Sequence, residues 1–386
     1  MPFEKLLAHR TRRMSRSAIR EILKVASQPG MISLAGGIPA PASFPLDLIG
    51  DLSRQVIDKY ADRAFQYDLT EGFMPLRQAV AAHLAGRDIH VPGETILITS
   101  GSQGVLDAAG KILLSRGDSV GVESPTYLGA LQAFSPYEPC YTPIPCDHEG
   151  IIPEALAPLL AKGRLKFIYL VPTFQNPSGR TLPLDRRRAI AALIERYDTL
   201  LIEDDPYCDL RYEGRALPPI KSLAPEHVVY VGTLSKVLAP GLRIGFCVAP
   251  EPIRNWLVLV KQGVDLHTST FNQALAADVN GLTEFAITGY LGNYGSGNVD
   301  AVVLEKEMGG RVYRGFVKRV FNAGTPSVNH LVIVQDDPDA LHTFSTYSYY
   351  DDHFVRGLNG TQRIYYLLYA GTDDGRIAVS GDGGGD

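Results

Sequence analysis

Five apolar segments between residues 95 and 250 each end abruptly in small or polar residues, and a helix-like segment usually follows. These segments do not alternate apolar with polar residues, so both faces of each strand are buried, as in a mainly parallel sheet covered by helices. In such sheets a ligand binds beyond the carboxyl ends of the strands, where all of these polar residues fall. The sequence therefore predicts an α/β fold with a site at one sheet edge. The segments are "TILITSGSQG", "DSVGVESPTY", "LKFIYLVPTFQNPSG", "DTLLIEDDPY" and "HVVYVGTLSK".

The composition narrows the classes of protein that this chain can represent. It has 386 residues, of which 45% are apolar and 20% charged, which suits a large core and two domains. A net charge of -5 argues against nucleic acid as a partner. No apolar stretch approaches the roughly 18 residues of a membrane span, and the N-terminus lacks the apolar core of a signal peptide. We therefore expect a cytoplasmic protein that binds neither a membrane nor nucleic acid.

The four cysteines show no spacing typical of a metal site, so we expect free thiols in a reducing compartment and no metal.

The composition of the sequence changes near residue 280, where glycine, asparagine and tyrosine become more frequent and helical periodicity is lost. We expect an N-terminal arm and part of a smaller α+β domain over residues 1–45. The large domain with the sheet would follow over 46–280, with one long helix from Glu251 to Val279. Residues 281–386 would complete the small domain, and the final "GDGGGD" is typical of a disordered tail.

The segment "VVYVGTLSKVLAPGLRIGF", residues 228–246, places Lys236 where a buried apolar run stops. Thr233 and Ser235 supply hydroxyls beside it, and Arg243 follows a Pro-Gly pair. Hydroxyls and a guanidinium suit a phosphate ester, and an amine beside them suits a Schiff base with pyridoxal phosphate. The residue order of a Walker A loop is absent. A lysine that is simply solvated at a strand end is the alternative.

The other strand ends carry residues that suit the same cofactor. A carboxylate such as Asp204 would keep a pyridine nitrogen protonated, although an acid there can also cap a helix. Ser102 opens a helix whose amide groups favour a phosphate, but a serine also serves as a helix cap. Asn176 and Tyr207 suit the ring hydroxyl, although Asn-Pro is also an ordinary turn. Tyr127 would stack on the ring or belong to the core. Together these residues predict a site for pyridoxal 5'-phosphate.

With these motifs in this order, the sequence resembles the fold-type I pyridoxal-phosphate enzymes of the class I/II aminotransferases. It is most similar to the branch of the 2-aminoadipate and kynurenine/aminoadipate aminotransferases. The resemblance covers roughly residues 15 to 280 and implies a large domain with a mainly parallel seven-stranded sheet. The motifs are "SAIREILKVASQPGMISLAGGIPAP", "QYDLTEGFMPLRQAV", "ITSGSQGVLD", "ESPTY", "PTFQNPSG", "IEDDPY", "GTLSKVLAPGLRIG" and "KQGVDLHTSTFNQ".

The resemblance implies a role for each matching residue. On the ring it implies Lys236 as the Schiff-base lysine, Asp204 under the pyridinium, Asn176 and Tyr207 on the ring hydroxyl, and Tyr127 stacked. The phosphate would be held by Ser102, Gln103, Thr233, Ser235 and Arg243.

The resemblance also implies contacts beyond the cofactor. Tyr67 would reach the phosphate in the partner subunit, so the active unit would be a homodimer. Gly37 and Asn176 would lie beside the substrate, and Arg20 matches an arginine that binds a distal carboxylate in some members. After residue 280 the family pattern fades, and Arg363 in "NGTQRIYYL" is the candidate for the substrate α-carboxylate.

The predicted function is transamination in amino-acid metabolism. The amino donor would be 2-aminoadipate, glutamate or one of a broad or aromatic range of L-amino acids, and the acceptor a 2-oxo acid such as 2-oxoglutarate. Lys236 would remove and return the Cα proton as general base and acid. A lyase or synthase on the same scaffold, a cofactor-binding sensor and an inactive homologue remain alternatives. A sensor of this fold carries a separate DNA-binding domain, for which the residues before "ISLAGG" are too few.

Overall fold

The computed structural model describes residues 3–14, 44, 46–211 and 215–279, together with the backbone of five strands between residues 302 and 377. The described residues fall into two compact units. One contains every element from the 3-10 helix η1 (Phe3–Leu6) to helix α10 (Thr270–Ala277), and the other contains the five strands. The domain limits at residues 45 and 280 remain predictions, and the C-terminal "GDGGGD" lies outside the described residues.

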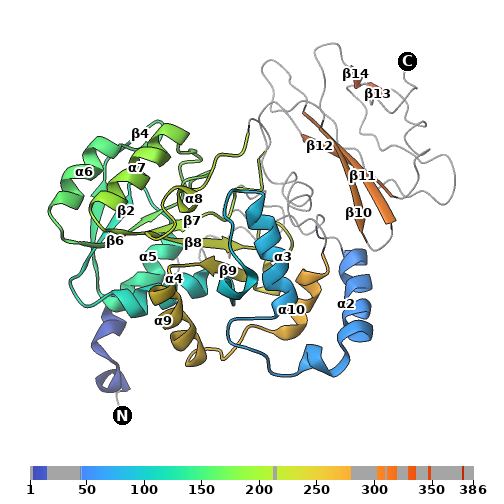
Figure 1. Cartoon of the computed structure of the whole chain (residues 1–386), viewed down its shortest axis with the longest axis horizontal. Coiled ribbons are helices and arrows are strands. Elements are labelled where there is room, and N and C mark those ends of the chain that lie inside the picture. The colour runs from blue at the N-terminus through green and yellow to red at the C-terminus, as the bar shows by residue number, and fades with distance from the viewer. Residues whose placement is uncertain are drawn as a thin grey trace. The chain divides into compact units, whose positions relative to one another are not determined.

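A seven-stranded sheet forms the centre of the first unit (Figure 1). This confirms the predicted α/β class with a large, mainly parallel sheet. In order across the sheet, the strands are β1 (Leu97–Thr99), β9 (Gly245–Val248), β8 (Val228–Thr233), β7 (Leu200–Asp204), β6 (Leu165–Leu170), β2 (Ser119–Glu123) and β3 (Cys140–Ile144).

One strand of this sheet runs against the others. Strands β3, β2, β6, β7 and β8 pair in parallel, whereas β9 is antiparallel to both of its neighbours, β8 and β1. Every residue of β8 is buried, as its unbroken apolar sequence predicts. Because β9 is reversed, its amino end lies at the sheet edge where β8 and β7 have their carboxyl ends.

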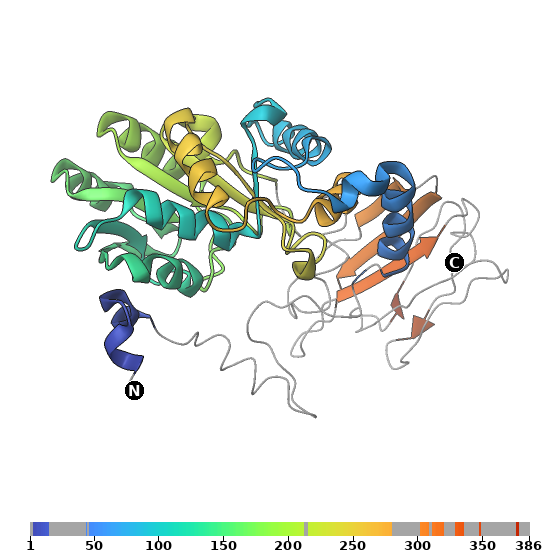
Figure 2. The ribbon, with the colours of Figure 1, turned by 90° about the horizontal axis from the view of Figure 1, so that it is seen from below.

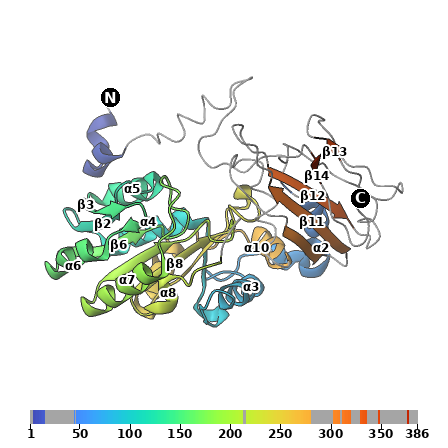
Figure 3. The same ribbon diagram turned by 90° about the horizontal axis from the view of Figure 1, so that it is seen from above.

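Helices cover both faces of the sheet, as the views from below and above show (Figures 2 and 3). Separate apolar clusters join each group of helices to the strands. On one face lie α4 (Ser102–Leu113), α5 (Leu128–Phe134) and α9 (Glu251–Gln262). On the other lie α6 (Pro153–Ala161), α7 (Leu184–Arg196) and α8 (Ile220–Leu223).

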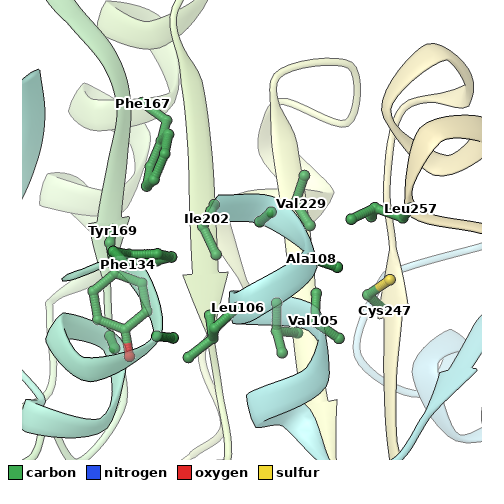
Figure 4. Packing of buried hydrophobic residues seen from close by; sticks show 14 of the residues in the cluster. Val105, Leu106, Ala108, Phe134, Phe167, Tyr169, Ile202, Val229, Cys247 and Leu257 are labelled. Atoms are coloured by element: carbon green, nitrogen blue, oxygen red, sulfur yellow. The ribbon is translucent and has the colours of Figure 1, made fainter. Parts of the chain in front are cut away.

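The apolar residues of the strands are divided between these two clusters. In Figure 4, Val105 and Leu106 of α4 lie over Ile202 of β7 and Val229 of β8. Leu201, the residue before Ile202 in β7, belongs to the opposite cluster. Burying each aliphatic side chain of this kind contributes about 1.5–3 kcal/mol. The strands are therefore held from both sides, and their ends are fixed in position.

The remaining elements of the first unit are shorter or lie beside the sheet. Lys59 Nζ donates a 2.7 Å hydrogen bond to Asp278 Oδ1, which joins α2 to the residue after α10. The shorter or peripheral elements of the first unit are η2 (His9–Arg13), α2 (Leu46–Tyr60), η4 (Ala61–Phe65), α3 (Met74–Ala85), η5 (Gly93–Thr95), η6 (Ser135–Tyr137), β4 (Cys146–Asp147), β5 (Gly150–Ile151) and η7 (Pro240–Leu242).

The second unit contains two antiparallel sheets. The larger has the strand order β10 (Val302–Met308), β11 (Arg311–Arg319) and β12 (Asn329–Gln335). The smaller pairs β13 (Tyr347–Ser348) with β14 (Arg376–Ile377).

The single helix predicted from Glu251 to Val279 is wrong, because the structure has two helices there, α9 and α10. Leu266, between them, has a φ of +62°, which a continuing right-handed helix excludes. The Ser269 side chain then accepts a hydrogen bond from the Asn272 amide and caps α10. Within the part of the chain that the structure describes, we found no helix with the length and apolar character of a membrane span.

Candidate active site

The predicted cofactor residues lie at one edge of the seven-stranded sheet. Most of them follow the carboxyl ends of strands, and Arg243 reaches the same edge because it precedes the reversed strand β9. The residues that follow or end these strands are Ser102 and Gln103 after β1, Tyr127 after β2, Asn176 after β6, Asp204 and Tyr207 at the end of β7, and Thr233, Ser235 and Lys236 at the end of β8.

Asp204 presents a buried carboxylate oxygen with an unfilled hydrogen-bonding capacity. The side chain is buried, with a relative exposure of 3%, and Tyr169 donates a 2.7 Å hydrogen bond to Oδ2. Among the described residues, Oδ1 has no hydrogen-bond partner. The pKa of Asp204 is raised to about 7, mainly by burial; the hydrogen bond from Tyr169 opposes the rise, and the charge of Asp205 contributes to it. A cationic ring N–H against Oδ1 would complete this site and favour the ionised carboxylate.

The predicted partners of the ring hydroxyl lie together beside the lysine. Asn176 Nδ2 donates a 3.2 Å hydrogen bond to the Tyr207 hydroxyl. The Nζ atom of Lys236 is 5.9 Å from the centre of the Tyr207 ring. Burial, and to a lesser degree the positive charge of Arg243, lowers the pKa of Lys236. These surroundings favour the neutral amine, which is the form that acts as a nucleophile or base.

Tyr127 is close enough to Asp204 and Arg243 for both charges to affect it. Its ring covers Gly129, where a Cβ atom would be only 2.5 Å from the ring carbon Cε1. Burial raises the pKa of Tyr127, Asp204 contributes to this rise, and Arg243 opposes it. The tyrosine is therefore close enough to both charged groups to respond to them, as a residue stacked on the cofactor would be.

A fully buried arginine shapes the loop that carries Asn176. Arg187 Nη2 donates hydrogen bonds to the Pro172 carbonyl at 2.9 Å and to the Thr173 hydroxyl at 3.0 Å. Its Nε donates to the Leu182 carbonyl at 2.9 Å. Since both ends of the loop bond to one rigid guanidinium, the position of Asn176 does not depend on regular secondary structure.

A second contact ties this loop to the end of β2. The Val171 amide donates a 2.9 Å hydrogen bond to Glu123 Oε2, and Gln175 Nε2 donates to the Pro125 carbonyl at 2.9 Å. Burial raises the pKa of Glu123 to about 8, so this carboxyl is largely neutral at neutral pH. The carboxyl therefore joins two strand ends without placing a full charge near Asn176.

The phosphate end of the site is built from the start of α4 and from Arg243. Gly101, with a φ of +82°, precedes the helix, and a Cβ there would be 2.8 Å from Arg243 Cζ. A Cβ at Gly245 would be 2.9 Å from the Gly101 carbonyl oxygen. The two glycines thus allow the guanidinium and β9 to approach the helix N-terminus. Free amide groups beside a guanidinium form a cradle for a phosphate.

Three of the predicted phosphate residues also make contacts within the protein. Thr233 Oγ1 donates to the Ile244 carbonyl at 3.1 Å and accepts a bond from the Ser235 amide at 3.1 Å. Gln103 Nε2 donates to the Gly129 carbonyl at 2.8 Å. The bond from Thr233 joins the end of β8 to the residue before β9, and the bond from Gln103 joins α4 to α5. Direct contact of these side chains with phosphate remains a prediction.

The other predicted residues are not part of this cluster or lie outside the described residues. Tyr67 is on the surface, with a relative exposure of 76%, and its ring packs edge-on against His267 with the ring centres 5.6 Å apart. Arg20, Gly37 and Arg363 lie outside the described residues. Their roles remain predictions.

Several supporting residues were not predicted from the sequence. Tyr169 lies within the apolar run of β6, so nothing in the pattern separates it from the core. Arg187 resembles a surface arginine among the charged residues of α7. Gly101 carried a usable signal, because a glycine just before a helix N-terminus allows close approach by a ligand or another backbone segment.

The geometry fits pyridoxal phosphate at three separate points. The Oδ1 atom of Asp204, which has no hydrogen-bond partner within the described part of the chain, suits a protonated pyridine nitrogen. The amine of Lys236 suits an aldehyde, and the cradle at Gly101 suits a phosphate. A protonated pyridine nitrogen, an aldehyde and a phosphate are all parts of pyridoxal phosphate, so one ligand accounts for all three features of the site.

Comparison with known proteins agrees with this interpretation. The family described as aminotransferase class I and II matches residues 52–286. The aromatic-amino-acid aminotransferase 1 of Thermococcus litoralis is 44% identical over 283 residues, which is 72% of this chain and 68% of that protein. The 2-aminoadipate transaminase of Thermus thermophilus is 40% identical over 272 residues, covering 69% and 67% respectively.

A solved structure is similar as well. The α-aminoadipate aminotransferase of Thermus thermophilus, complexed with N-(5'-phosphopyridoxyl)-L-leucine, aligns with a TM-score of 0.69 and 34% sequence identity. The alignment covers 81% of this chain and 82% of that one. The two chains share the fold, and that enzyme binds a molecule of the chemical type that the candidate site fits.

Proposed function

Since the chain belongs to the class I and II aminotransferase family, we propose that it transfers the amino group of 2-aminoadipate, glutamate or an aromatic L-amino acid to 2-oxoglutarate. The general reaction, transamination with pyridoxal phosphate, follows from membership of the family. The choice of donor rests on relatives of the chain, which include aromatic-amino-acid and 2-aminoadipate aminotransferases.

One observation carries the assignment of residues, namely the placement of Lys236 beside Tyr207, on the turn that follows the buried Asp204, whose Oδ1 atom has no hydrogen-bond partner within the described chain. Bound pyridoxal phosphate would hold the substrate amino group and withdraw electrons from its Cα atom. Asp204 Oδ1 would accept a hydrogen bond from the ring nitrogen and stabilise its positive charge. The Asn176 amide and the Tyr207 hydroxyl, which are hydrogen-bonded to each other at 3.2 Å, would donate hydrogen bonds to the ring oxygen.

Lys236 acts as the proton carrier in this proposal. Its lowered pKa increases the fraction of neutral amine near neutral pH, so Nζ can accept the proton from the substrate Cα. The ammonium form then returns the proton. The positive charge of Arg243 helps to keep the amine neutral and would also pair with the phosphate.

The other assignments complete the site. Ser102, Gln103, Thr233 and Ser235 would bind the phosphate with Arg243, and Tyr127 would stack on the ring. Arg363 would bind the α-carboxylate of the substrate beside Gly37 and Asn176, and Arg20 would bind a distal carboxylate.

We infer a homodimer in which Tyr67 serves the phosphate of the other subunit. Tyr67 is 76% exposed, and two exposed apolar residues, Phe65 and Leu69, flank it in sequence. An exposed aromatic and apolar surface of this kind suits a protein interface. The four free cysteines suit a reducing compartment, which supports a place in cytoplasmic amino-acid metabolism.

Replacement of the lysine tests the proposed chemistry. Lys236→Ala should reduce turnover by roughly a thousandfold or more, because the proton carrier is lost, while the phosphate cradle still binds cofactor. Lys162→Ala, at an exposed lysine, is the control. The assay follows cofactor absorbance after an L-amino acid is added alone, and then after 2-oxoglutarate is added. Ordinary turnover in Lys236→Ala would contradict the assignment.

The specificity proposal is tested by comparing an acidic with an apolar donor. In Arg20→Ala, kcat/KM for 2-aminoadipate should fall by roughly tenfold or more while kcat/KM for leucine is preserved, because only the former has a distal carboxylate. Arg12→Ala, at an exposed arginine of the same basic region, serves as control. Equal losses for both donors would remove Arg20 from substrate recognition.

Co-expression of two defective chains tests the shared site. If Tyr67 acts across the dimer, Tyr67→Ala and Lys236→Ala chains combined in one dimer form one site with both residues intact. Activity should then return to the mixed dimer. No recovery in purified mixed dimers would place Tyr67 in its own subunit's site or outside both sites.

A further inference from the structure

A buried ion pair beside the active site has no part in the proposed chemistry. Arg87 lies just after α3, and its Nη2 atom is 2.7 Å from Asp205 Oδ2. The two side chains are only 10% and 0% exposed. A buried ion pair often adds little net stability, because both charges lose their water. Its presence therefore suggests a role in holding a particular local geometry.

The ion pair belongs to a hydrogen-bond network that contacts both ends of one turn, residues 205–208. Arg87 Nη1 donates hydrogen bonds to the Tyr230 hydroxyl and to Cys208 Sγ, the latter at 2.8 Å. The Tyr230 hydroxyl donates to Asp205 Oδ2 at 3.2 Å. Cys208 Sγ in turn donates to the Asp205 carbonyl at 3.3 Å. A single guanidinium thus contacts the first and last residues of the segment 205–208.

This turn carries two of the groups assigned to the cofactor ring. Asp204 is the residue immediately before it, and Tyr207 lies within it. The backbone of the turn is also tied to the sheet, because the Asp205 amide donates a 2.9 Å hydrogen bond to the Val231 carbonyl. Any shift of residues 205–208 would therefore move the carboxylate and the phenol together.

We propose that Arg87 is a positioning residue, which holds the turn 205–208 so that Asp204 Oδ1 and the Tyr207 hydroxyl face the ring of pyridoxal phosphate. The proposal rests on the proposed function, which assigns the ring contacts to these two residues. Arg87 itself touches neither the cofactor nor the substrate in this proposal. It acts through the turn.

The chemistry of arginine explains why this side chain is suited to the role. Its planar fork reaches the carboxylate, the phenol and the thiol at once, whereas the single ammonium group of a lysine cannot span them all. The guanidinium also offsets the charge of Asp205, which adjoins Asp204 and contributes to its raised pKa. Loss of Arg87 would thus misplace the turn and leave an uncompensated charge next to the ring carboxylate.

The ring end and the phosphate end of the site are structurally separate, which gives a selective test. Gly101, Ser102 and Arg243 belong to α4 and the segment before β9, and the hydrogen bonds of Arg87 described above end instead on Asp205, Cys208 and Tyr230. In the full-length chain depleted of cofactor, two quantities are measured. One is the dissociation constant for pyridoxal phosphate, and the other is that for inorganic phosphate as its competitor.

Arg87→Met should weaken binding of pyridoxal phosphate by roughly tenfold or more, because the ring contacts are misplaced, and change phosphate binding by less than about twofold. Arg87→Lys keeps the charge that stabilises the fold but loses the fork, so it should show the same selective loss to a smaller degree. Arg186→Met is the matched control. It removes another largely buried guanidinium, 15% exposed and paired with Asp147 at 2.7 Å, which also bonds to the Gly150 and Ile151 carbonyls of β5.

Selective weakening in both Arg87 variants, with Arg186→Met unchanged, supports the proposal. Equal weakening for both ligands, no weakening in Arg87→Lys, or a similar loss in Arg186→Met would overturn it. If the parent chain itself failed to bind pyridoxal phosphate, the proposed function would be refuted as well. Normal binding by the parent together with unaffected Arg87 variants would refute this inference alone.

Discussion

The buried carboxylate of Asp204 should destabilise the protein when the cofactor is absent, and to an extent that depends on pH. Its pKa is raised from the ordinary 3.8 to about 7, with burial as the main cause. Between these two values the folded chain holds a proton that the unfolded chain has lost. The contribution of this group to stability therefore falls as the pH rises towards 7. Asp204→Asn removes the ionisable group and keeps an acceptor for the Tyr169 hydroxyl.

The size of the effect follows from the separation of the two pKa values. One pKa unit corresponds to about 1.4 kcal/mol, so the penalty reaches about 4 kcal/mol at pH 8 and is only about 2 kcal/mol at pH 5. Any change in packing caused by the amide is the same at both pH values. The stability difference between variant and parent should therefore grow by about 2 to 3 kcal/mol in favour of the variant from pH 5 to pH 8.

The assay is urea unfolding of the two cofactor-free proteins at both pH values, with the free energy of unfolding as the readout. Asp58→Asn, at an exposed carboxylate on α2, is the matched control and should show no such growth. A difference between Asp204→Asn and the parent that stays constant with pH would refute the reasoning.

Saturating pyridoxal phosphate should reverse the order of stability. In the parent, the ionised carboxylate then has a cationic partner, which the amide cannot match. The cofactor should therefore raise the unfolding free energy of the parent more than that of Asp204→Asn.

Two further outcomes follow from the local geometry. Gly101→Ala should lose about 1–3 kcal/mol of stability through its positive φ, and should also bind pyridoxal phosphate at least about tenfold more weakly because the new Cβ crowds Arg243. Gly117→Ala has a similar φ of +85° with nothing within 4 Å of the Cβ, so it should lose stability alone, and equal binding losses would contradict the cradle. A thiol reagent should label the exposed Cys140 in the native protein but Cys247 only after unfolding, because burial raises the pKa of Cys247 to about 12; rapid native labelling of Cys247 would contradict this.

Much of the site was predictable because its residues follow strand ends in a recognisable order. Asp204 ends β7, and Tyr207 and Lys236 each lie three residues beyond the end of a buried strand; parallel strands place such positions at one edge. The break at Leu266 was not predictable, because the apolar spacing of α9 and α10 reads as one continuous helix. A helix cannot continue through Leu266, because this residue has a positive φ, which leucine rarely adopts.

The sequence by itself determined the layered α/β architecture and the sheet edge at which the candidate residues of the site gather. These follow from local composition, since burial on both faces demands continuous apolar strands and leaves polar residues only at their ends. Tertiary structure alone decided the reversal of β9, the hydrogen bond from Tyr169 to Asp204 and the ion pair of Arg87 with Asp205 in the turn 205–208. Such contacts join residues far apart in the chain, and the energy that selects them arises only when the strands and helices have packed together.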